Sequence, residues 1–387
     1  MILIMLVQEY LKEFGLQKLQ DELKVTVREY PDRIVLNYDQ IESKKNHPVV
    51  DECRALILRK DTWEVMARSF DRFYNCGELK SNSDFPISQA RVEEKVDGSI
   101  MSVYWDGNKW CVSTRSMADA EGTIPLGLTF RQVFDKATPP ELWKVLNASE
   151  ITRHHTWVFE LTSPETRVVT PYSTASLTFI GARNNLNEQE MTGKELDVFA
   201  KMFRIRRPRS YKFTTLEETV AFVKTLNSMD EGFVLTYENG SSFWRLKCKN
   251  EKYLAIAHMR ENGDLSPHRI LRLIVSNEQA EYLSYFPEDK KYFDFVDEKW
   301  QESLTRIQTI YSQFKDVTTQ KDFALGIMPL CKYDFEKGMI FDMRKGKTIQ
   351  EVINKIDQHG CKRITKGMNL RSEFSKKFGV QVDEEEA

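Results

Sequence analysis

The sequence predicts an α+β protein with a β-rich N-terminal region and an all-helical C-terminal region. Apolar and polar residues alternate in short stretches between residues 40 and 252, which is typical of half-buried strands. Pairs of these stretches are separated by short turn sequences, as in antiparallel hairpins. From Tyr253 onward apolar residues recur at every third or fourth position, which is helical spacing. We therefore expect mostly antiparallel sheets with flanking helices in residues 1–252 and helices in residues 253–387.

Composition and charge restrict the class of protein. The chain has 387 residues, 41% of them hydrophobic and 29% charged, as in globular proteins of two or three domains. Its formal net charge of −2 predicts that any surface for nucleic acid is local. The six cysteines include no Cys-x-x-Cys pair, which favours reduced thiols in the cytoplasm over a zinc framework. The apolar start, residues 1–7, is too short to span a membrane, and we expect no membrane association.

The N-terminal elements are predicted from their apolar spacing. Residues 1–23 have the spacing of a helix, whose buried stripe would contain Leu6, Tyr10, Leu11, Phe14 and Leu19. Residues 54–68 read as two strands joined by a turn. Arg54 and Arg68 then stand at strand ends, and Arg72 lies in the turn beyond. These arginines are either ordinary surface residues or phosphate donors, because the guanidinium group matches phosphate oxygens.

The segment Lys95-Val96-Asp97-Gly98 places a lysine two residues before an Asp-Gly pair. The alternation on both sides predicts two strands that meet at a tight turn, with Lys95 at a strand end. Gly98 would let another group approach the backbone closely. An amine attacks only when neutral, so we expect cationic neighbours or desolvation to lower the pKa of Lys95 if it is a nucleophile. Taken alone, such a tetrapeptide is most often a surface turn.

The middle of the chain predicts further strands. Residues 101–115 read as a second hairpin, and residues 156–161 and 177–182 read as buried strands. Glu160 lies inside the first of these buried strands, where a carboxylate costs several kcal/mol unless it has a partner. It either pairs with a structural arginine, such as Arg167, or faces a polar pocket.

Two capping boxes and a basic run follow. Thr192 and Thr215 each precede a glutamate by three residues, which predicts the start of a helix at each. Residues 201–212 contain six basic residues and no acidic one. Such a run is usually a solvated face, and here it is also a candidate track for a polyanion.

Residues 230–249 predict a third hairpin that turns at Asn239-Gly240. Its return strand contains Lys247 and Lys249, which face the same side because side chains alternate along a strand. Two cations on one face repel each other unless they share an anion. The pair therefore indicates a bound phosphate, and the alternative is an exposed edge strand with two solvated lysines.

The C-terminal third predicts helices. A helical stripe is expected from Phe293, Val296, Trp300, Leu304, Ile307, Tyr311 and Phe314. Residues 324–330 and 348–356 read as further helices, and residues 383–386 form an acidic tail.

Together these residues suit attack on a nucleoside triphosphate. A lysine would attack the α-phosphorus, cations would hold the phosphates, and the carboxylates of Glu160 and Glu231 would serve a Mg²⁺ site. The sequence contains no P-loop motif and no convincing Ser-His-Asp set.

The order of the motifs carries a resemblance. The segments are Glu52-Cys53-Arg54, residues 67–75, Lys95-Val96-Asp97-Gly98, Val158-Phe159-Glu160, residues 230–234, and Leu246-Lys247-Cys248-Lys249 followed by Tyr253. This series resembles the covalent nucleotidyltransferase superfamily and, within it, the phage-type RNA ligase 1 family. The resemblance covers about residues 50–255 and is faint in the C-terminal third.

The resemblance implies roles for individual residues. Lys95 would be the nucleophile that takes AMP, and Glu231 would hold Mg²⁺, or Mn²⁺ in its place. ATP would be contacted by Arg54, Arg72, Lys95, Glu160, Lys247 and Lys249. Further site residues would be Asp97, Gly98, Arg68, Phe73, Asn75 and Arg115. The chain departs from the family in having arginine at positions 72 and 115, where lysine is common, which keeps the charge but changes its geometry.

The implied activity is ATP-dependent RNA ligation in three steps. Lys95 takes AMP from ATP, the AMP passes to an RNA 5′-phosphate, and an RNA 3′-hydroxyl then expels it. Residues 1–252 would form the adenylyltransferase domain, and residues 253–387 a helical domain that recognises RNA. We expect a monomer in the cytoplasm (the host cytoplasm if the protein is viral) that repairs RNA such as cleaved tRNA.

Two rival functions follow from the same residues. A DNA ligase or a GTP-dependent mRNA-capping enzyme would also use the lysine, but these enzymes typically place a small β-barrel after the last motif. The helical stripe from Phe293 to Phe314 argues against a barrel. The other rival is a catalytically silent RNA-binding relative, which failure to react with ATP would reveal.

Overall fold

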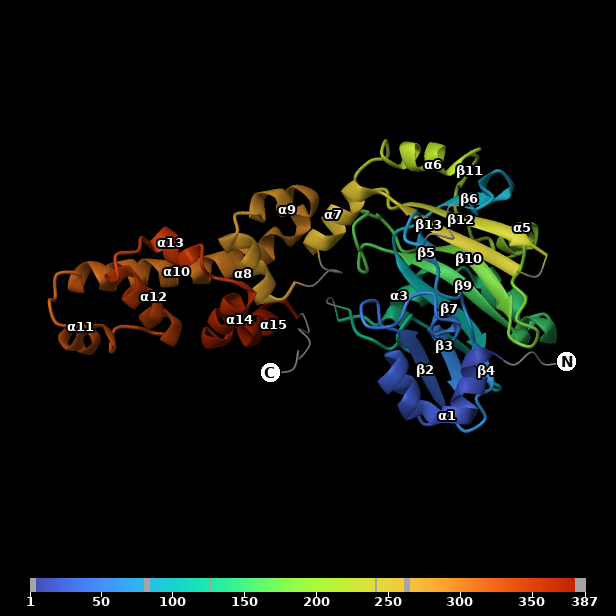
Figure 1. Ribbon diagram of the computed structural model, residues 1–387, viewed down its shortest axis with the longest axis horizontal. Coiled ribbons are helices and arrows are strands. Elements are labelled where there is room, and N and C mark those ends of the chain that lie inside the picture. Colours follow the sequence, from blue (N-terminus) through green and yellow to red (C-terminus); the bar gives the residue numbers. More distant parts are fainter. Residues whose placement is uncertain (1–4, 80–83, 125–126, 241, 261–264, 380–387) are drawn as a thin grey trace. The chain divides into compact units, whose positions relative to one another are not determined.

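The computed structural model describes residues 5–79, 84–124, 127–240, 242–260 and 265–379. The chain divides into two compact units (Figure 1). One contains the described residues up to 124 and those from 128 to 257, and the other contains the described residues from 258 onward. Helix α7 (Glu251–Arg260) runs across this division, and the boundary predicted after residue 252 lies inside it.

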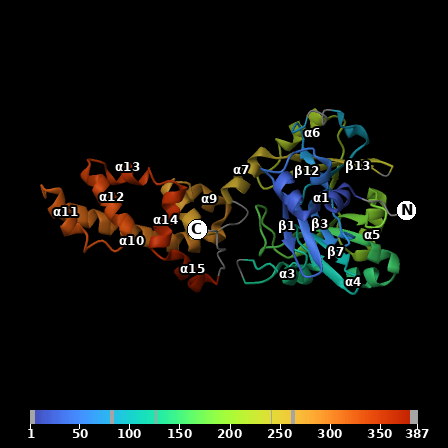
Figure 2. The ribbon, with the colours of Figure 1, turned by 60° about the horizontal axis from the view of Figure 1, so that its bottom comes forward.

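The first sheet lies at the start of the chain and is antiparallel. Its strands, in spatial order, are β1 (Val25–Glu29), β2 (Arg33–Tyr38), β3 (Arg54–Arg59) and β4 (Val65–Ala67). Helix α1 (Leu6–Leu23) lies against this sheet (Figure 2). Its Leu11 and Leu19 share a core with the strands, and α2 (Pro48–Glu52) precedes β3. The hairpin predicted at residues 54–68 is present, whereas strands β1 and β2 were not predicted.

The predicted stripe of α1 is partly wrong. Leu11 and Leu19 are buried, but Leu6 and Phe14 are 46% and 41% exposed. The buried residues of the helix are Val7, Leu11 and Leu19, and Gly15, whose φ of 79° interrupts the helix, lies between the last two. Residues before and after this kink therefore do not share one continuous helical face.

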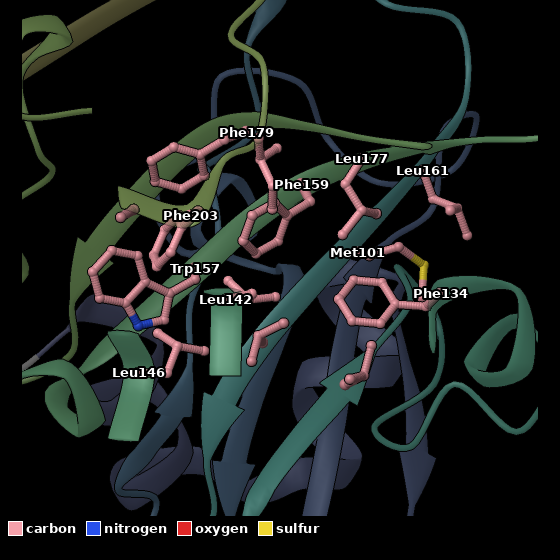
Figure 3. Packing of buried hydrophobic residues seen from close by; sticks show 14 of the residues in the cluster. Met101, Phe134, Leu142, Leu146, Trp157, Phe159, Leu161, Leu177, Phe179 and Phe203 are labelled. Carbon is pink, nitrogen blue, oxygen red and sulfur yellow. The ribbon is translucent and has the colours of Figure 1, made fainter. Parts of the chain in front are cut away.

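The second sheet is antiparallel and carries the largest core. Its strands, in order, are β10 (Ser176–Asn184), β9 (His155–Thr162), β7 (Ser99–Trp105) and β8 (Trp110–Ser113). One face is covered by α3 (Phe130–Ala137), α4 (Pro140–Asn147) and α5 (Gly193–Phe203). Figure 3 shows Trp157 and Phe159 of β9 and Phe179 of β10 meeting Phe203 of α5. The strands predicted at residues 101–115, 156–161 and 177–182 are all present.

The third sheet has five strands. Their order is β11 (Ser210–Tyr211), β6 (Arg91–Glu94), β12 (Gly232–Asn239), β13 (Ser242–Lys249) and β5 (Tyr74–Asn75). Only the pair of β13 and β5 is parallel among these described strands. Helix α6 (Leu216–Val223) covers one face, with Val223 packed among Phe233 and Leu235. The hairpin predicted at residues 230–249 is β12 and β13.

The segment around Lys95 differs from the simplest interpretation of its alternation. The strands on its two sides, β6 and β7, belong to different sheets and do not pair with each other. Residues 95–98 are therefore a crossover from the third sheet to the second. Lys95 is anchored at its start, because its backbone N–H donates to the carbonyl of Gly232 at 2.8 Å.

Both predicted capping boxes begin helices. Thr192 caps α5 by accepting from the backbone N–H of Glu195, and Thr215 caps α6 by accepting from that of Glu218. Short 3₁₀ helices in the described part of the chain include Ile87–Gln89, Glu150–His154 and Pro287–Asp289.

The second unit is helical throughout its described residues. Its helices are α8 (Pro267–Val275), α9 (Gln279–Tyr285), α10 (Lys290–Phe314), α11 (Gln320–Ile327), α12 (Asp334–Arg344), α13 (Ile349–Ile353), α14 (Gln358–Gly367) and α15 (Leu370–Phe378). The stripe predicted on α10 buries Phe293, Val296, Trp300 and Ile307. The helices expected at residues 324–330 and 348–356 are α11 and α13, with different ends, and the acidic tail lies outside the described residues.

The α+β fold class is therefore confirmed. Among the helices that the structure describes, none has both the length and the apolar composition of a membrane span.

Candidate active site

A cavity of about 360 Å³ in the first unit collects residues from all three sheets. Alternation along the strands decides which side chains reach it. Leu246 and Cys248 of β13 are buried in the core under α6, whereas Arg245, Lys247 and Lys249 line the cavity. The predicted site residues that line it are Arg54, Arg72, Phe73, Asn75, Lys95, Arg115, Glu160, Lys247 and Lys249. Residues that are up to 195 positions apart in the sequence thus share one cavity, from Arg54 to Lys249.

The cavity has a strong excess of positive charge. Its cationic side chains are Lys45, Arg54, Arg72, Arg91, Lys95, Arg115, Arg245, Lys247 and Lys249. Its acidic side chains are Glu78, Glu93, Glu94 and Glu160. Because the whole chain is nearly neutral, this excess is local, as the net charge predicted. Such a lining suits a polyanion, and a triphosphate is of the right charge.

Lys95 is held by an ion pair. Its Nζ lies 2.7 Å from Oε2 of Glu231, and the Nζ of Lys249 lies 3.2 Å from the other oxygen of the same carboxylate. Glu231 itself does not line the cavity; its side chain is buried beneath the two lysines. The carboxylate therefore holds two strand-end cations in fixed positions.

The ionisation of Lys95 differs from the expectation. Burial lowers its pKa, but the carboxylates of Glu231 and Glu160 outweigh this effect, and the pKa of Lys95 is raised overall. The expected neutral amine is therefore not the resting form. The alternation pattern indicated the cationic neighbours but not the carboxylate of Glu231, which is 136 residues away in the sequence.

Lys247 shows the opposite behaviour. Its burial, followed by the charges of Arg54, Lys249 and Lys95, lowers its pKa to about 7. Its Nζ lies 5.0 Å from the ring centroid of Phe73 rather than beside a carboxylate. A bound anion would favour the charged form of this lysine.

Glu160 faces the polar cavity, which was one of the two alternatives for it. Burial raises its pKa to about 8; Lys95 opposes this rise, and the carboxylates of Glu231 and Asp97 add to it. The side chain projects from β9 opposite to the core-facing Phe159 and Leu161. A protonated or hydrogen-bonded carboxyl group at this place can bind a sugar hydroxyl.

Three arginines are positioned by aromatic rings. The ring of Tyr38 lies between two of them, with its centroid 4.2 Å from the guanidinium carbon of Arg72 and 4.9 Å from that of Arg115. The guanidinium carbon of Arg54 lies 5.2 Å from the ring centroid of Phe73. A ring holds a guanidinium group in place while its N–H groups can still donate to an anion.

Asp97 and Gly98 do not line the cavity; they fix the crossover that carries Lys95. The buried carboxylate of Asp97 accepts from the backbone N–H groups of Val169 at 2.9 Å and Thr170 at 2.6 Å. It also accepts from the hydroxyl of Tyr253 at 2.6 Å. A Cβ on Gly98 would lie 2.4 Å from the carbonyl oxygen of Leu161. Gly98 thus permits the close backbone approach that the sequence predicted.

Gly98→Ala is expected to destabilise the first unit by about 1–3 kcal/mol, because the added methyl group must displace the backbone of β9. The displacement would also move Lys95 and slow its reaction with a nucleotide. Urea unfolding, followed by the fluorescence of the tryptophans, measures the stability. The matched control is Gly338→Ala in α12, where no atom lies within 4 Å and alanine favours the helix. Equal stability changes in the two variants would contradict the prediction.

Arg68 has a structural place rather than a position in the cavity. Its buried guanidinium group lies 2.8 Å from Asp71 and 2.9 Å from Glu188. Asp71 in turn pairs with Arg183 at 3.0 Å, and Glu190 joins Arg183 to Arg245. The network therefore ends on Arg245, a cavity residue that was not predicted although it continues the alternation of Lys247 and Lys249.

Other cavity residues were also not predicted from the sequence. Tyr38 lies on β2, a strand that was not predicted, so no sequence signal placed its ring. Lys45 and Glu78 form an ion pair of 2.8 Å beside Asn75. Their pairing depends on the course of a loop that has no regular spacing.

The basic run at residues 201–212 is not a free cationic track. Arg204 lies 3.2 Å from Glu141, Arg207 lies 2.6 Å from Glu93, and Arg209 lies 3.9 Å from Glu94. Acidic residues from distant segments therefore pair with three of the six basic residues. The polyanion track stays a prediction.

The carboxylates of Glu231 and Glu160 are compatible with a divalent cation that binds together with the phosphates of a substrate. Mg²⁺ typically uses one or two carboxylates together with substrate phosphates and water. Glu231 and Glu160 both interact electrostatically with Lys95, and the two oxygens of the Glu231 carboxylate are paired with Lys95 and Lys249. Within the described residues, no group of three or more His, Cys, Asp or Glu side chains forms a metal site by itself.

Comparison with known proteins identifies a family for this chain. A family model described as RNA ligase matches residues 52–253, which is about half of the chain. A protein of Autographa californica nuclear polyhedrosis virus, named as a bifunctional polynucleotide kinase/RNA ligase, is 32% identical over 297 residues. That match covers 73% of this chain and 42% of the viral protein, so this chain matches less than half of its relative's length.

Two further proteins show similarity to the chain. The RNA ligase of Rhodothermus phage RM378 is 25% identical over 330 residues, which cover 68% of this chain and 70% of the phage protein. A solved structure, a mutant of the Naegleria gruberi RNA ligase with AMP and Mn, has 16% identity and a TM-score of 0.39. It covers 48% of this chain and 57% of that one.

Proposed function

Because the chain belongs to the phage-type RNA ligase 1 family, we propose that it is an ATP-dependent enzyme that joins an RNA 5′-phosphate to an RNA 3′-hydroxyl. One observation carries the proposal: the amino group of Lys95 lies in a cavity lined by cations and is held by a single buried carboxylate. This arrangement orients a lysine amine inside a cavity whose cations can bind the phosphates of a triphosphate.

In the first step the Nζ of Lys95 attacks the α-phosphorus of ATP. A P–N bond forms, the bond from the α-phosphorus to the bridging oxygen breaks, and pyrophosphate leaves. Lys95 must first lose its ion pair with Glu231 and release its proton to water, after which burial favours the neutral amine. Arg54, Arg72 and the two β13 lysines would bind the phosphates. When bound, Mg²⁺ or Mn²⁺, held by Glu231 and phosphate oxygens, would neutralise negative charge on the triphosphate.

The two later steps use the same cations. AMP passes from Lys95 to an RNA 5′-phosphate, and the 3′-hydroxyl of a second RNA end then attacks this phosphate and expels AMP. Each step is a displacement at phosphorus, so Lys247, Lys249 and Arg54 would stabilise similar charge each time. Glu160 would hold the ribose hydroxyls of the adenosine through both transfers.

The sealing assay tests this function. RNA with a 5′-phosphate and a 3′-hydroxyl is incubated with the full chain, Mg²⁺ and ATP, and the products are separated by length. We expect joined RNA with ATP and little product with GTP or with DNA ends. Joining of DNA ends alone would support a DNA ligase, and labelling of the protein by GTP alone would support a capping enzyme. Failure of both nucleotides to label the protein would support a silent RNA-binding relative.

The second unit is proposed to bind the RNA substrate. Four basic residues on α14 and α15 motivate this role: Lys362, Arg363, Lys366 and Arg371. We propose that they help to bind structured RNA such as a cleaved tRNA anticodon loop, in RNA repair by a monomer in the cytoplasm. The double variant Arg363→Glu/Lys366→Glu should then seal cleaved tRNA more slowly than it seals unstructured RNA. Equal losses on both RNAs would contradict this role.

ATP binding is expected to take up a proton through Lys247. This lysine has a pKa of about 7 in the free protein, so it is largely neutral at pH 8.5. Phosphate groups favour its charged form, and binding should therefore weaken as the pH rises above 7, by up to tenfold per unit. Calorimetry in buffers of different ionisation enthalpy, with an α,β-methylene analogue of ATP that cannot transfer AMP, measures the uptake.

The control for proton uptake is Lys247→Arg. Arginine stays charged at this pH, so the variant should take up nearly one proton fewer per nucleotide bound. Equal uptake by the wild type and the variant would show that another group is responsible.

A further inference from the structure

Two cysteines lie side by side behind the wall of the cavity. Strand β5 lies beside β13 (Figure 1). The two strands are parallel, with Tyr74 opposite Leu246 and Asn75 opposite Lys247. The backbone N–H of Cys76 continues this pairing by donating to the carbonyl of Lys247 at 2.8 Å. One further step in the same register places Cys76 opposite Cys248. The two residues are 172 positions apart in the sequence, so alternation alone did not reveal them.

The positions suit a disulfide bond. Neighbouring strands are about 4.8 Å apart, and a disulfide joins Cα atoms that are about 4.4–6.8 Å apart. Both side chains belong to the same apolar cluster, which Val92, Phe233 and Leu246 also form. In the structure neither cysteine is in a disulfide, so the pair is reduced.

The two thiols differ in a way that suits oxidation. Cys76 is partly exposed, whereas Cys248 is buried. A hydrogen bond from the thiol of Cys248 lowers the pKa of Cys76, and the same contact raises the pKa of Cys248. Cys76 is thus the better thiolate and is the one that a small oxidant can reach, while Cys248 is placed to react second.

We propose that Cys76 and Cys248 form a redox-modification site, at which a hydroperoxide converts the two thiols into a reversible disulfide. The thiolate of Cys76 attacks the peroxide, the O–O bond breaks, and a sulfenic acid and one molecule of water (or alcohol) form. The sulfur of Cys248 then attacks the sulfenic sulfur, the S–O bond breaks, and water leaves. The two thiols lose two electrons, which reduce the peroxide, and thiol reductants reverse the change.

The bond would secure one wall of the cavity. Only two residues of β5 pair with β13, so this strand is held weakly by backbone bonds. The disulfide would join the segment that carries Arg72, Phe73 and Asn75 to the strand that carries Lys247. Because Cys248 points away from the cavity, the side chains of Lys247 and Lys249 keep their positions, and the nucleotide site stays assembled in the oxidised protein.

The experiment uses the full-length chain with hydrogen peroxide, followed by alkylation of the remaining thiols and peptide mass spectrometry. We expect a peptide pair linked through Cys76 and Cys248, a loss of two hydrogens from the intact mass, and reversal by dithiothreitol. The cross-link closes a long loop, so the melting temperature should rise by about 5 °C. These readouts do not depend on the ligase activity of the protein.

Cysteine variants identify the bond. Cys76→Ser should lose both the cross-link and the shift in melting temperature. Cys331→Ser removes the other partly exposed cysteine of the described chain and should behave as the wild type does. If Cys248→Ser does not fold, Cys76→Ser still decides the question. Absence of the linked peptide in the oxidised wild type, or an equal shift in Cys76→Ser, would overturn the proposal.

Discussion

Replacing Lys95 with alanine should abolish the transfer of label from α-labelled ATP to the protein. The nucleophile for the first step is the amino group at this position, and alanine leaves no group that can form the P–N bond. The neighbouring lysines start from other backbone positions: Lys249 is bound to the far oxygen of Glu231, and Lys247 lies against Phe73. Incubation with labelled ATP and Mg²⁺, followed by a denaturing gel, measures the covalent product.

Two further variants test whether Lys95 is the nucleophile. Lys95→Arg keeps a cation beside Glu231 but stays protonated, so it should also remain unlabelled. Lys60→Ala removes a surface lysine, whose partner is Glu29 at 2.7 Å, and should be labelled as fully as the wild type. Label on Lys95→Ala would move the nucleophile to another lysine and break the assignment of the motif.

Local spacing predicted most of the first unit's strands but not their partners. Alternation identified both strands of β12 and β13, because a tight turn places their pairing within one short stretch of sequence. The same signal flanks Lys95, yet β6 and β7 join different sheets. The choice between a hairpin and a crossover depends on contacts with strands more than 100 residues away, which spacing alone does not contain.

The candidate site was also predicted only in part. The period of two placed Lys247 and Lys249 on one face, whereas the cost of burying Glu160 left a structural arginine and a polar pocket as equal alternatives. Charge states were not predictable, because the pKa of Lys95 is set by carboxylates that the fold brings from other strands. Arg68 illustrates the converse: its position resembles that of Arg54, but its acidic partners turn it into a structural residue.

Glu231→Gln is expected to lower the rate of lysine labelling by about 100-fold, as losses of one preorganised electrostatic group commonly do. Glutamine keeps the shape of the side chain but loses its charge. The carboxylate then no longer orients Lys95 at 2.7 Å and Lys249 at 3.2 Å, and it no longer offers a charged ligand to Mg²⁺. Single-turnover labelling over a range of Mg²⁺ concentrations measures the loss and its dependence on the metal.

This variant separates two roles of the carboxylate that act in opposite directions. Glu231 is the strongest contributor that raises the pKa of Lys95, so its neutralisation increases the fraction of neutral, nucleophilic amine. If holding the proton were its whole role, Glu231→Gln would be labelled faster than the wild type at neutral pH. If the carboxylate orients the lysine and binds the metal, labelling slows although the amine is more often neutral.

We expect the second outcome, with the pH profile of the residual labelling shifted to lower pH. Leaving two half-buried lysines without their partner should also cost about 1 kcal/mol of stability, so thermal unfolding must show that the variant is folded. Glu64→Gln, an exposed carboxylate beside Arg59, is the matched control and should keep the wild-type rate. Faster labelling of a folded Glu231→Gln, with unchanged Mg²⁺ dependence, would show that the carboxylate restrains the nucleophile and does not serve the chemistry.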